Sequence, residues 1–345
     1  MVAVVTGAGG GVGSRVVTTL ARRHERVVAV DIDEVAIKQL VEYAADEGLD
    51  VIGQILDITD DTAVAVGVSD IESRVGPITA LVNGAGVLRT GAAVEFSDAD
   101  WARTFDVNVR APFVLSREVA RHMIPRRAGS VVTVASNAAL VARKGMTAYA
   151  ASKAAANAFT KSLGLELAEY GIRCNVVAPG STDTPMLRAM LGDSSDAGLV
   201  AGSLGDYKPG IPLGRVAQPQ HIADAVAFLL SDQAAHITMH THRVEGGADH
   251  RAGQRRGCVE DRCGSGVFRR GLGTYLRCQC PCALRAEPRG GPAYDSTPRG
   301  IRRDGRLQRG AGGAQGHDGL RGIQGRSQCL HQEPRPRAGR VWNPL

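Results

Sequence analysis

The feature that most constrains the fold of this 345-residue chain is a set of six short apolar runs. Longer segments, which include stretches of helical periodicity, separate these runs. The runs are rich in β-branched residues and nearly continuous, as expected of parallel strands buried on both faces. They cover residues 2–5, 27–30, 51–56, 80–82, 130–134 and 173–177. Helical segments cover residues 15–23, 35–47, 101–123 and 150–170. This alternation predicts an α/β fold of the Rossmann type: a doubly wound parallel sheet with helices on both faces.

The chain changes in character near residue 250. Residues 251–345 contain 19 Arg, no Lys and 7 acidic side chains, whereas residues 1–250 contain 22 basic and 28 acidic ones. Residues 1–250 are therefore expected to form a mildly acidic catalytic and cofactor-binding domain. We expect the Gly- and Pro-rich remainder to be disordered, because it buries too little apolar surface to offset the entropy of ordering.

The composition of residues 251–345 also bears on their origin. Arg, Gly and Pro codons are GC-rich and Lys codons are not, so a GC-rich gene read out of frame yields such a segment. The hypothesis is a frameshift or read-through product, with a natural disordered arm as the alternative. The genomic DNA around codons 235–255 distinguishes the two. The segment would attract polyanions by charge alone, so no specific nucleic-acid partner is expected.

Cysteine usage and the N-terminal sequence predict the compartment. Cys174 is the only cysteine in residues 1–250, which suits a reducing environment. The first residues read as a strand and a glycine loop, without the charged region, apolar core and cleavage site of a signal peptide. No apolar run approaches the roughly 20 residues of a membrane span. We expect a cytoplasmic protein with no membrane partner.

A glycine-rich loop follows the first predicted strand. Gly7, Gly11 and Gly13, with Val12 between the last two, precede a helix that starts near Ser14. Glycine lets the backbone approach a pyrophosphate and turn tightly into a helix N-terminus, where free N–H groups favour anions. The loop predicts a dinucleotide cradle; a simple Gly-rich turn is the alternative.

Carboxylates end the second and third predicted strands. Asp31 lies about twenty residues after the loop, where a carboxylate binds the ribose hydroxyls of NAD and repels the 2′-phosphate of NADP. NAD is therefore the predicted cofactor. Helix capping is the alternative for Asp31, although Asp33 could take that role. Asp57 and Ile58 are expected to meet the adenine, with turn capping as the alternative for Asp57.

Three polar residues predict the chemistry. Tyr149 and Lys153 are i and i+4 on a helix, so their side chains share one face. A nearby ammonium favours the phenolate and lowers the pKa of a tyrosine, which makes it a better base at neutral pH. Ser136 follows a predicted strand at the sheet edge where ligands of such folds bind. Its hydroxyl can steady a substrate oxygen whose proton Tyr149 removes or returns.

With Asn83-Gly-Ala-Gly86, Asn108 and Pro179-Gly180, these motifs resemble the short-chain dehydrogenase/reductase family over roughly residues 1–250. The resemblance implies that Tyr149 is the acid/base, that Ser136 orients the substrate and that Asn108 supports a proton-relay water. It also implies that Lys153 holds the nicotinamide ribose and tunes Tyr149. The remaining implied cofactor contacts are Asn83, Ala85, Gly86, Pro179, Gly180 and Thr182. Gly84 stands where the family often has Asn.

Further stretches resemble members of the family that oxidise a carboxylated cyclohexadiene diol, 2,3-dihydro-2,3-dihydroxybenzoate, with NAD in catecholate siderophore biosynthesis. The most distinctive are Gly86-Val-Leu-Arg89 and Pro179-Gly-Ser-Thr-Asp-Thr184. An anionic substrate calls for a cation, and Arg89 and Arg143 are the candidates, with solvated loop arginines as the alternative. Met186 is expected to belong to a lid over the ring or to the core.

Other functions remain open. They are reduction of another ketone or alcohol, such as a 3-oxoacyl group on a carrier protein, or dinucleotide binding without catalysis. The resemblance implies a homotetramer, but it weakens where His242 and Arg243 stand at positions expected to be apolar. No metal site is expected, because His240-x-His242 lacks accompanying carboxylates and Cys278-x-Cys280-x-Cys282 lacks zinc-module spacing.

Overall fold

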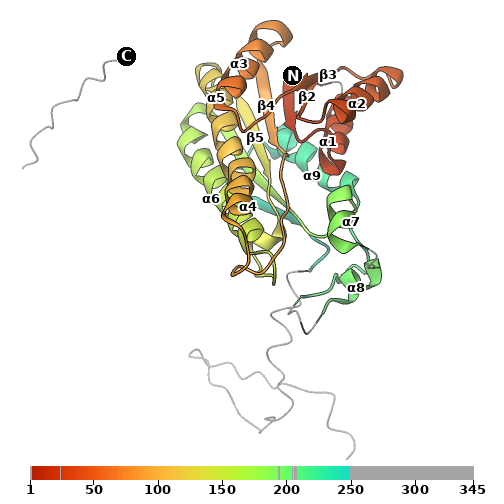
Figure 1. The fold of residues 1–345 in the computed structure, drawn as a ribbon. Helices are drawn as coiled ribbons and strands as arrows, with labels where there is room; N and C mark the ends of the chain where they lie inside the picture. Colours follow the sequence, from red (N-terminus) through yellow and green to blue (C-terminus); the bar gives the residue numbers. More distant parts are fainter. Residues whose placement is uncertain (1, 24, 193–194, 204, 206–207, 249–345) are drawn as a thin grey trace, which may run out of the picture. The chain divides into compact units, whose positions relative to one another are not determined.

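The computed structural model describes residues 2–23, 25–192, 195–203, 205 and 208–248. Within these residues seven parallel strands form one sheet in the order β3-β2-β1-β4-β5-β6-β7 (Figure 1). The strands are β1 (Val2–Thr6), β2 (Arg26–Asp31), β3 (Val51–Ile55), β4 (Ile78–Asn83), β5 (Gly129–Val134), β6 (Ile172–Pro179) and β7 (Thr241–Val244). The predicted doubly wound sheet is confirmed. The expectations for residues 251–345 lie outside the described part of the chain.

Helices cover both faces of the sheet (Figure 1). They are α1 (Gly11–Ala21), α2 (Glu34–Asp46), α3 (Asp61–Asp70), α4 (Asp98–Phe105), α5 (Ala111–Arg126), α6 (Thr147–Leu167), α7 (Pro185–Leu191), α8 (Asp196–Ala201) and α9 (Pro219–Leu230). The apolar core on one face includes Leu20 of α1 and Ile222 of α9, and a second core includes Val68 of α3 and Val119 of α5. None of the helices in the described residues is long and apolar enough to cross a membrane.

The helix predicted over residues 101–123 is interrupted. α4 runs into a π-helical turn, Asp106–Arg110, and α5 follows without a loop. A π-helical turn widens the helix locally and changes the direction of the side chains after it. Periodicity does not show such an insertion, so the sequence predicted one regular helix where there are two joined by this turn.

β7 forms despite its polar sequence. It pairs with β6 at the edge of the sheet, where His242 is partly exposed and Arg243 is exposed. The Val176 N–H donates to the His240 carbonyl at 2.8 Å and the Gly180 N–H to the Val244 carbonyl at 2.9 Å. An edge strand has one open side, so His242 and Arg243 fit where the sequence analysis expected apolar residues.

Candidate active site

A cavity of about 860 Å³ lies at the C-terminal ends of the strands, where the strand order reverses between β1 and β4. Most of the predicted site residues line it. They are Gly7, Gly11, Val12, Gly13, Asp31, Asp57, Ile58, Ala85, Gly86, Ser136, Arg143, Tyr149, Lys153, Pro179, Gly180, Thr182 and Met186. Asn83, Arg89 and Asn108 are the predicted residues that the structure places behind or beside it.

Only glycine fits at several positions of the loop, because other backbone atoms approach it closely. Gly7 has φ +70°, and a Cβ there would lie 2.7 Å from the Ala85 Cα. A Cβ on Gly13 would overlap the Gly7 carbonyl oxygen. Gly10, the N-cap of α1, has no side chain to satisfy the first N–H groups, so these groups are available to an anion. The loop therefore has the form of a pyrophosphate cradle.

Asp31 extends from the end of β2 to the glycine loop. Its Oδ2 accepts from the Gly9 N–H at 2.9 Å and its Oδ1 from the Asp33 N–H at 3.1 Å. The cap of α2 is Asp33, which accepts from the Ala36 N–H at 3.0 Å. The capping alternative for Asp31 is therefore wrong, and its carboxylate lies at the cavity.

Asp57 lines the cavity and also caps a turn. Its Oδ1 accepts from the Thr59 N–H at 2.9 Å and from the Thr59 hydroxyl at 2.7 Å. These hydrogen bonds favour the carboxylate and hold its pKa below the ordinary range, with Arg103 adding a smaller effect of the same sign. The two interpretations of Asp57 are thus compatible, because turn capping fixes a side chain at the cavity wall.

Ser136, Tyr149 and Lys153 come together at the ends of β5 and α6. Burial raises the pKa of Tyr149, opposed by a hydrogen bond with Ser136 and by the charge of Arg143. Burial lowers the pKa of Lys153 to about 8. The Lys153 Nζ donates to the Val134 carbonyl at 2.9 Å and lies 5.9 Å from the centre of the Tyr149 ring. The hydrogen bond to Val134 fixes the ammonium beside the Tyr149 ring, and the tuning of Tyr149 by Lys153 stays a prediction.

Asn108 positions a loop. Its Oδ1 accepts from the Val87 N–H at 2.9 Å, and its Nδ2 donates to the Val87 carbonyl and to the Ser152 hydroxyl, both at 3.0 Å. The side chain is 1% exposed and lies behind Gly86, where a Cβ would come within 3.2 Å of the amide oxygen. The amide holds the loop after β4 in place rather than facing the cavity.

Asn83 is a structural residue in this arrangement. Its Nδ2 donates to the Ser116 hydroxyl at 3.0 Å and to the Thr133 hydroxyl at 3.3 Å. The side chain is buried between β4, β5 and α5, on the inner side of the strand end. Ala85 and Gly86 are among the described residues that line the cavity and Asn83 is not, so the contact of Asn83 with the adenine ribose stays a prediction.

The two candidate arginines differ. Arg89 is 60% exposed and its Nε lies 3.6 Å from the Asp100 Oδ1, on the surface beside α4. Arg143 lines the cavity near Tyr149. Arg143 therefore lies where it could meet a bound substrate, whereas Arg89 is not among the described residues that line the cavity. Three further cations that no sequence motif indicated also line the cavity: Arg103, Lys144 and Lys208.

α7 covers the cofactor end of the cavity. Thr184 caps α7 by accepting from the Leu187 N–H at 3.2 Å, and Pro185 follows at its first position. A Cβ on Gly11 would lie 3.1 Å from the Pro185 Cδ, so the start of α7 rests on the glycine loop. Met186 lines the cavity from α7 and is 42% exposed, which fits a side chain over a ligand better than one in the core.

Comparisons with known proteins agree with this geometry. The profile of the family described as short chain dehydrogenase matches residues 1–194. The chain belongs to the short-chain dehydrogenase family. It is accordingly an oxidoreductase that acts on a CH–OH group and binds a dinucleotide, as the sequence motifs predicted.

Several relatives are similar over about 70% of this chain. The 2,3-dihydro-2,3-dihydroxybenzoate dehydrogenase of Bacillus subtilis is 48% identical over 248 residues, 72% of this chain and 95% of the relative. The Escherichia coli protein of that name is 40% identical, with 71% and 95% covered. The 3-oxoacyl-[acyl-carrier-protein] reductase FabG of Escherichia coli is 37% identical, with 71% and 96% covered. A 7α-hydroxysteroid dehydrogenase structure complexed with NADH superposes with TM-score 0.67 at 31% identity, covering 72% and 93%.

Proposed function

We propose that this protein catalyses the NAD-dependent oxidation of 2,3-dihydro-2,3-dihydroxybenzoate to 2,3-dihydroxybenzoate, a step of catecholate siderophore biosynthesis. The observation that carries the proposal is the 48% identity to the Bacillus subtilis enzyme of this name, over almost its whole length. Arg143 supports it, because a cation lines the cavity on which Ser136, Tyr149 and Lys153 converge.

The site residues divide the chemistry among them. The Tyr149 phenolate takes the proton of one ring hydroxyl while the Ser136 hydroxyl donates to the same oxygen. NAD supplies the acceptor for the hydride that leaves the ring carbon. Lys153 keeps a positive charge beside the site, where it would hold the nicotinamide ribose. The ketone formed is a tautomer of the aromatic catechol, so removal of a proton from the ring carbon and protonation of the ketone oxygen complete the reaction and make it strongly favourable.

The end of β2 supports NAD over NADP. Asp31 places a carboxylate at the cavity, and the next acidic residues, Asp33 and Glu34, add negative charge to the same turn. The nearby Lys38 is paired with Glu34, with 2.6 Å between Nζ and Oε1. A 2′-phosphate would meet these carboxylates, whereas the two ribose hydroxyls of NAD can donate to Asp31.

Arg143 is the proposed partner of the substrate carboxylate, and Met186 is proposed to cover the ring. A guanidinium can bind a carboxylate through two parallel hydrogen bonds and so fix the ring relative to Tyr149. Arg89 lies outside the cavity and has no part in this proposal. The apolar contact of Met186 comes from α7, the helix that also rests on the glycine loop.

The proposal includes a cytoplasmic homotetramer without nucleic-acid or membrane partners. A free, buried Cys174 supports a reducing compartment. Trp101 on α4 and Phe113 on α5 are each 43% exposed, which supports burial of this helical surface between copies of the chain. Chromatography with light scattering checks the mass of the assembly.

Reduction of a 3-oxoacyl carrier-protein substrate is the second candidate, favoured by the 37% identity to the Escherichia coli reductase. The test is to compare kcat/KM of the full chain for three substrates: the carboxylated diol with NAD, the same diol without its carboxylate, and a 3-oxoacyl thioester with NADPH. We expect the first to exceed the second by about 100-fold. A preference for the thioester, or NADH binding with no turnover, would contradict the proposal.

A further inference from the structure

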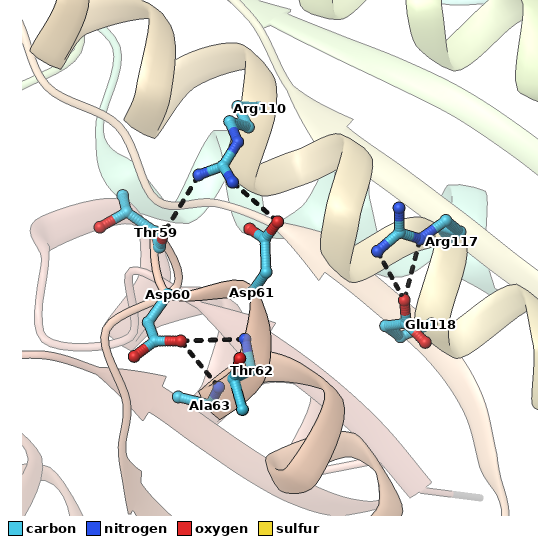
Figure 2. Close-up of polar contacts among 8 residues, drawn as sticks. All are labelled: Thr59, Asp60, Asp61, Thr62, Ala63, Arg110, Arg117 and Glu118. Atoms are coloured by element: carbon cyan, nitrogen blue, oxygen red, sulfur yellow. Dashed lines mark hydrogen bonds and ion pairs between the residues drawn. The ribbon is translucent and has the colours of Figure 1, made fainter. Parts of the chain in front are cut away.

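Arg110 ends the π-helical turn Asp106–Arg110 and reaches across to the turn between β3 and α3 (Figure 2). Its Nη1 donates to the Thr59 carbonyl at 3.2 Å, and its Nη2 lies 2.7 Å from the Asp61 Oδ2. One planar guanidinium therefore contacts both Thr59 in that turn and Asp61, the first residue of α3, a geometry that a single ammonium cannot reproduce.

The turn held by Arg110 is a wall of the cavity. Residues 56–59 line the cavity, and Thr59 donates both its N–H and its hydroxyl to Asp57. Next along the chain, Asp60 caps α3 by accepting from the Thr62 N–H at 2.9 Å and the Ala63 N–H at 3.0 Å (Figure 2). Thr59 is thus fixed on the cavity side by Asp57 and on the outer side by Arg110.

The same π-helical turn also positions a second segment that lines the cavity, the loop after β4. Asn108, two residues before Arg110, binds both the N–H and the carbonyl of Val87, and Val87 lines the cavity. Its amide also donates to Ser152 on α6, the residue before Lys153. Two side chains of one turn therefore connect the β3–α3 wall with the loop after β4 and with the catalytic helix. Such π-helical turns are frequent at functional sites.

We propose that Arg110 is a positioning residue for the cofactor: by holding Thr59 and Asp61, it fixes the cavity wall of Asp57 and Ile58 against which the adenine of NAD packs. Arg110 is not one of the described residues that line the cavity, so it acts through the turn that it contacts. The inference rests on the proposed function in taking NAD as the ligand, but it does not depend on the identity of the substrate.

The contact contributes to cofactor binding more than to folding. The side chains of Arg110 and Asp61 are 50% and 41% exposed, and ion pairs with this exposure add little to the free energy of unfolding. By contrast, if the turn that lines the cavity is already ordered in the free protein, NAD binding does not bear the entropic cost of ordering it. Loss of Arg110 should therefore weaken NAD binding while leaving Tm and kcat at saturating NAD nearly unchanged.

The first experiment is a fluorescence titration of the full chain with NADH, without substrate. For Arg110→Gln we expect the Kd of NADH, and the KM of NAD, to rise about three- to tenfold. Arg110→Lys should recover part of this loss, because an ammonium can still reach Asp61. Arg117→Gln is the matched control: Arg117 pairs with the adjacent Glu118, with 2.8 Å between Nη2 and Oε1, and does not reach the turn (Figure 2).

A second measurement separates positioning from a general charge effect. Hydrogen exchange of the ligand-free protein should show faster exchange of the Thr59, Thr62 and Ala63 amides in Arg110→Gln than in Arg117→Gln. Equal NADH affinity in wild type and Arg110→Gln would overturn the inference, as would equal weakening by both substitutions. NADH binding without turnover of the diol would overturn the proposed reaction and leave the Arg110 comparison valid. Absence of NADH binding by the wild type would overturn both.

Discussion

The two halves of the active-site cavity are built by different means. The half formed by β1, α1 and the end of β2 consists largely of backbone: Gly7 at φ +70°, Gly13 against the Gly7 carbonyl, and the N-terminus of α1. The half formed by β5, α6, α7 and the loop before α6 consists largely of side chains, including Tyr149 and Arg143. Few substitutions are therefore compatible with the backbone of the first half. In the second half, by contrast, single substitutions can change the substrate preference.

This difference explains what each half should do when it is mutated. A change in the backbone half affects every reaction of the enzyme through the dinucleotide. A change in the side-chain half should leave dinucleotide binding intact and alter the chemistry or the choice of substrate. Variants that change only one of these properties would support this division of labour, and variants that change both would contradict it.

The largest difference between the effect on catalysis and the effect on cofactor binding is expected for Tyr149→Phe. Without the phenol there is no group to take the hydroxyl proton, so kcat for the diol should fall by about a thousandfold. The Kd of NADH should stay within about twofold of wild type, since Tyr149 is only one of the residues around the nicotinamide end. Stopped-flow absorbance and NADH fluorescence measure the two quantities. A kcat within tenfold of wild type would remove Tyr149 from the acid/base role.

Arg143→Gln should weaken substrate binding and leave cofactor binding unchanged. We expect the KM of the diol to rise by about 10- to 100-fold because the carboxylate loses its charged partner. Arg89→Gln is the matched control, with a KM change below about twofold, because Arg89 pairs with Asp100 outside the cavity. Similar effects of both substitutions on KM would show that neither arginine is specific for the carboxylate.

The same variant has a predicted pH dependence. The charge of Arg143 opposes the rise in the pKa of Tyr149 that burial causes, so its removal raises that pKa further. Oxidation needs the deprotonated phenol, and kcat/KM should therefore increase with pH through this pKa. The rising limb of the profile should lie at higher pH in Arg143→Gln than in wild type. A limb at the same or lower pH would contradict the electrostatic role of Arg143.

Asp31→Ser should affect the cofactor half alone. Removal of the carboxylate takes away a hydrogen-bond acceptor for the ribose and a repulsion of the 2′-phosphate, so the preference for NAD over NADP should fall by about tenfold or more. The diol KM at saturating cofactor should not change. The ratio of kcat/KM for the two cofactors provides the measurement. An unaltered ratio would mean that Asp31 does not select the cofactor.

The smallest effect is expected at β7. His242→Val replaces a partly exposed polar residue of an edge strand with a good strand former, and should stabilise the fold by about 0.5 kcal/mol or less. Thermal unfolding provides the measurement. A stabilisation of several kcal/mol would mean that the polar sequence of this strand disturbs the core, contrary to its position at the sheet edge.

The same contrast explains how much the sequence could predict. The strands, the sheet and the glycine loop follow from local patterns, because a buried parallel strand and a Gly turn each need particular residues at consecutive positions. Other features depend on segments distant in sequence or on a single added residue in a helix. They are the pairing of Arg89 with Asp100, the buried position of Asn83 and the π-helical turn that ends at Arg110. No local pattern encodes them. The same holds for Arg103, Lys144 and Lys208 in the cavity wall.

The most direct test is to incubate the purified full chain with NAD and 2,3-dihydro-2,3-dihydroxybenzoate and to record NADH formation together with the appearance of the aromatic product. We predict that one NADH forms for each 2,3-dihydroxybenzoate, at a kcat/KM well above that obtained with NADP. Failure to form the product, in a protein that binds NADH and reduces 3-oxoacyl thioesters, would contradict the account.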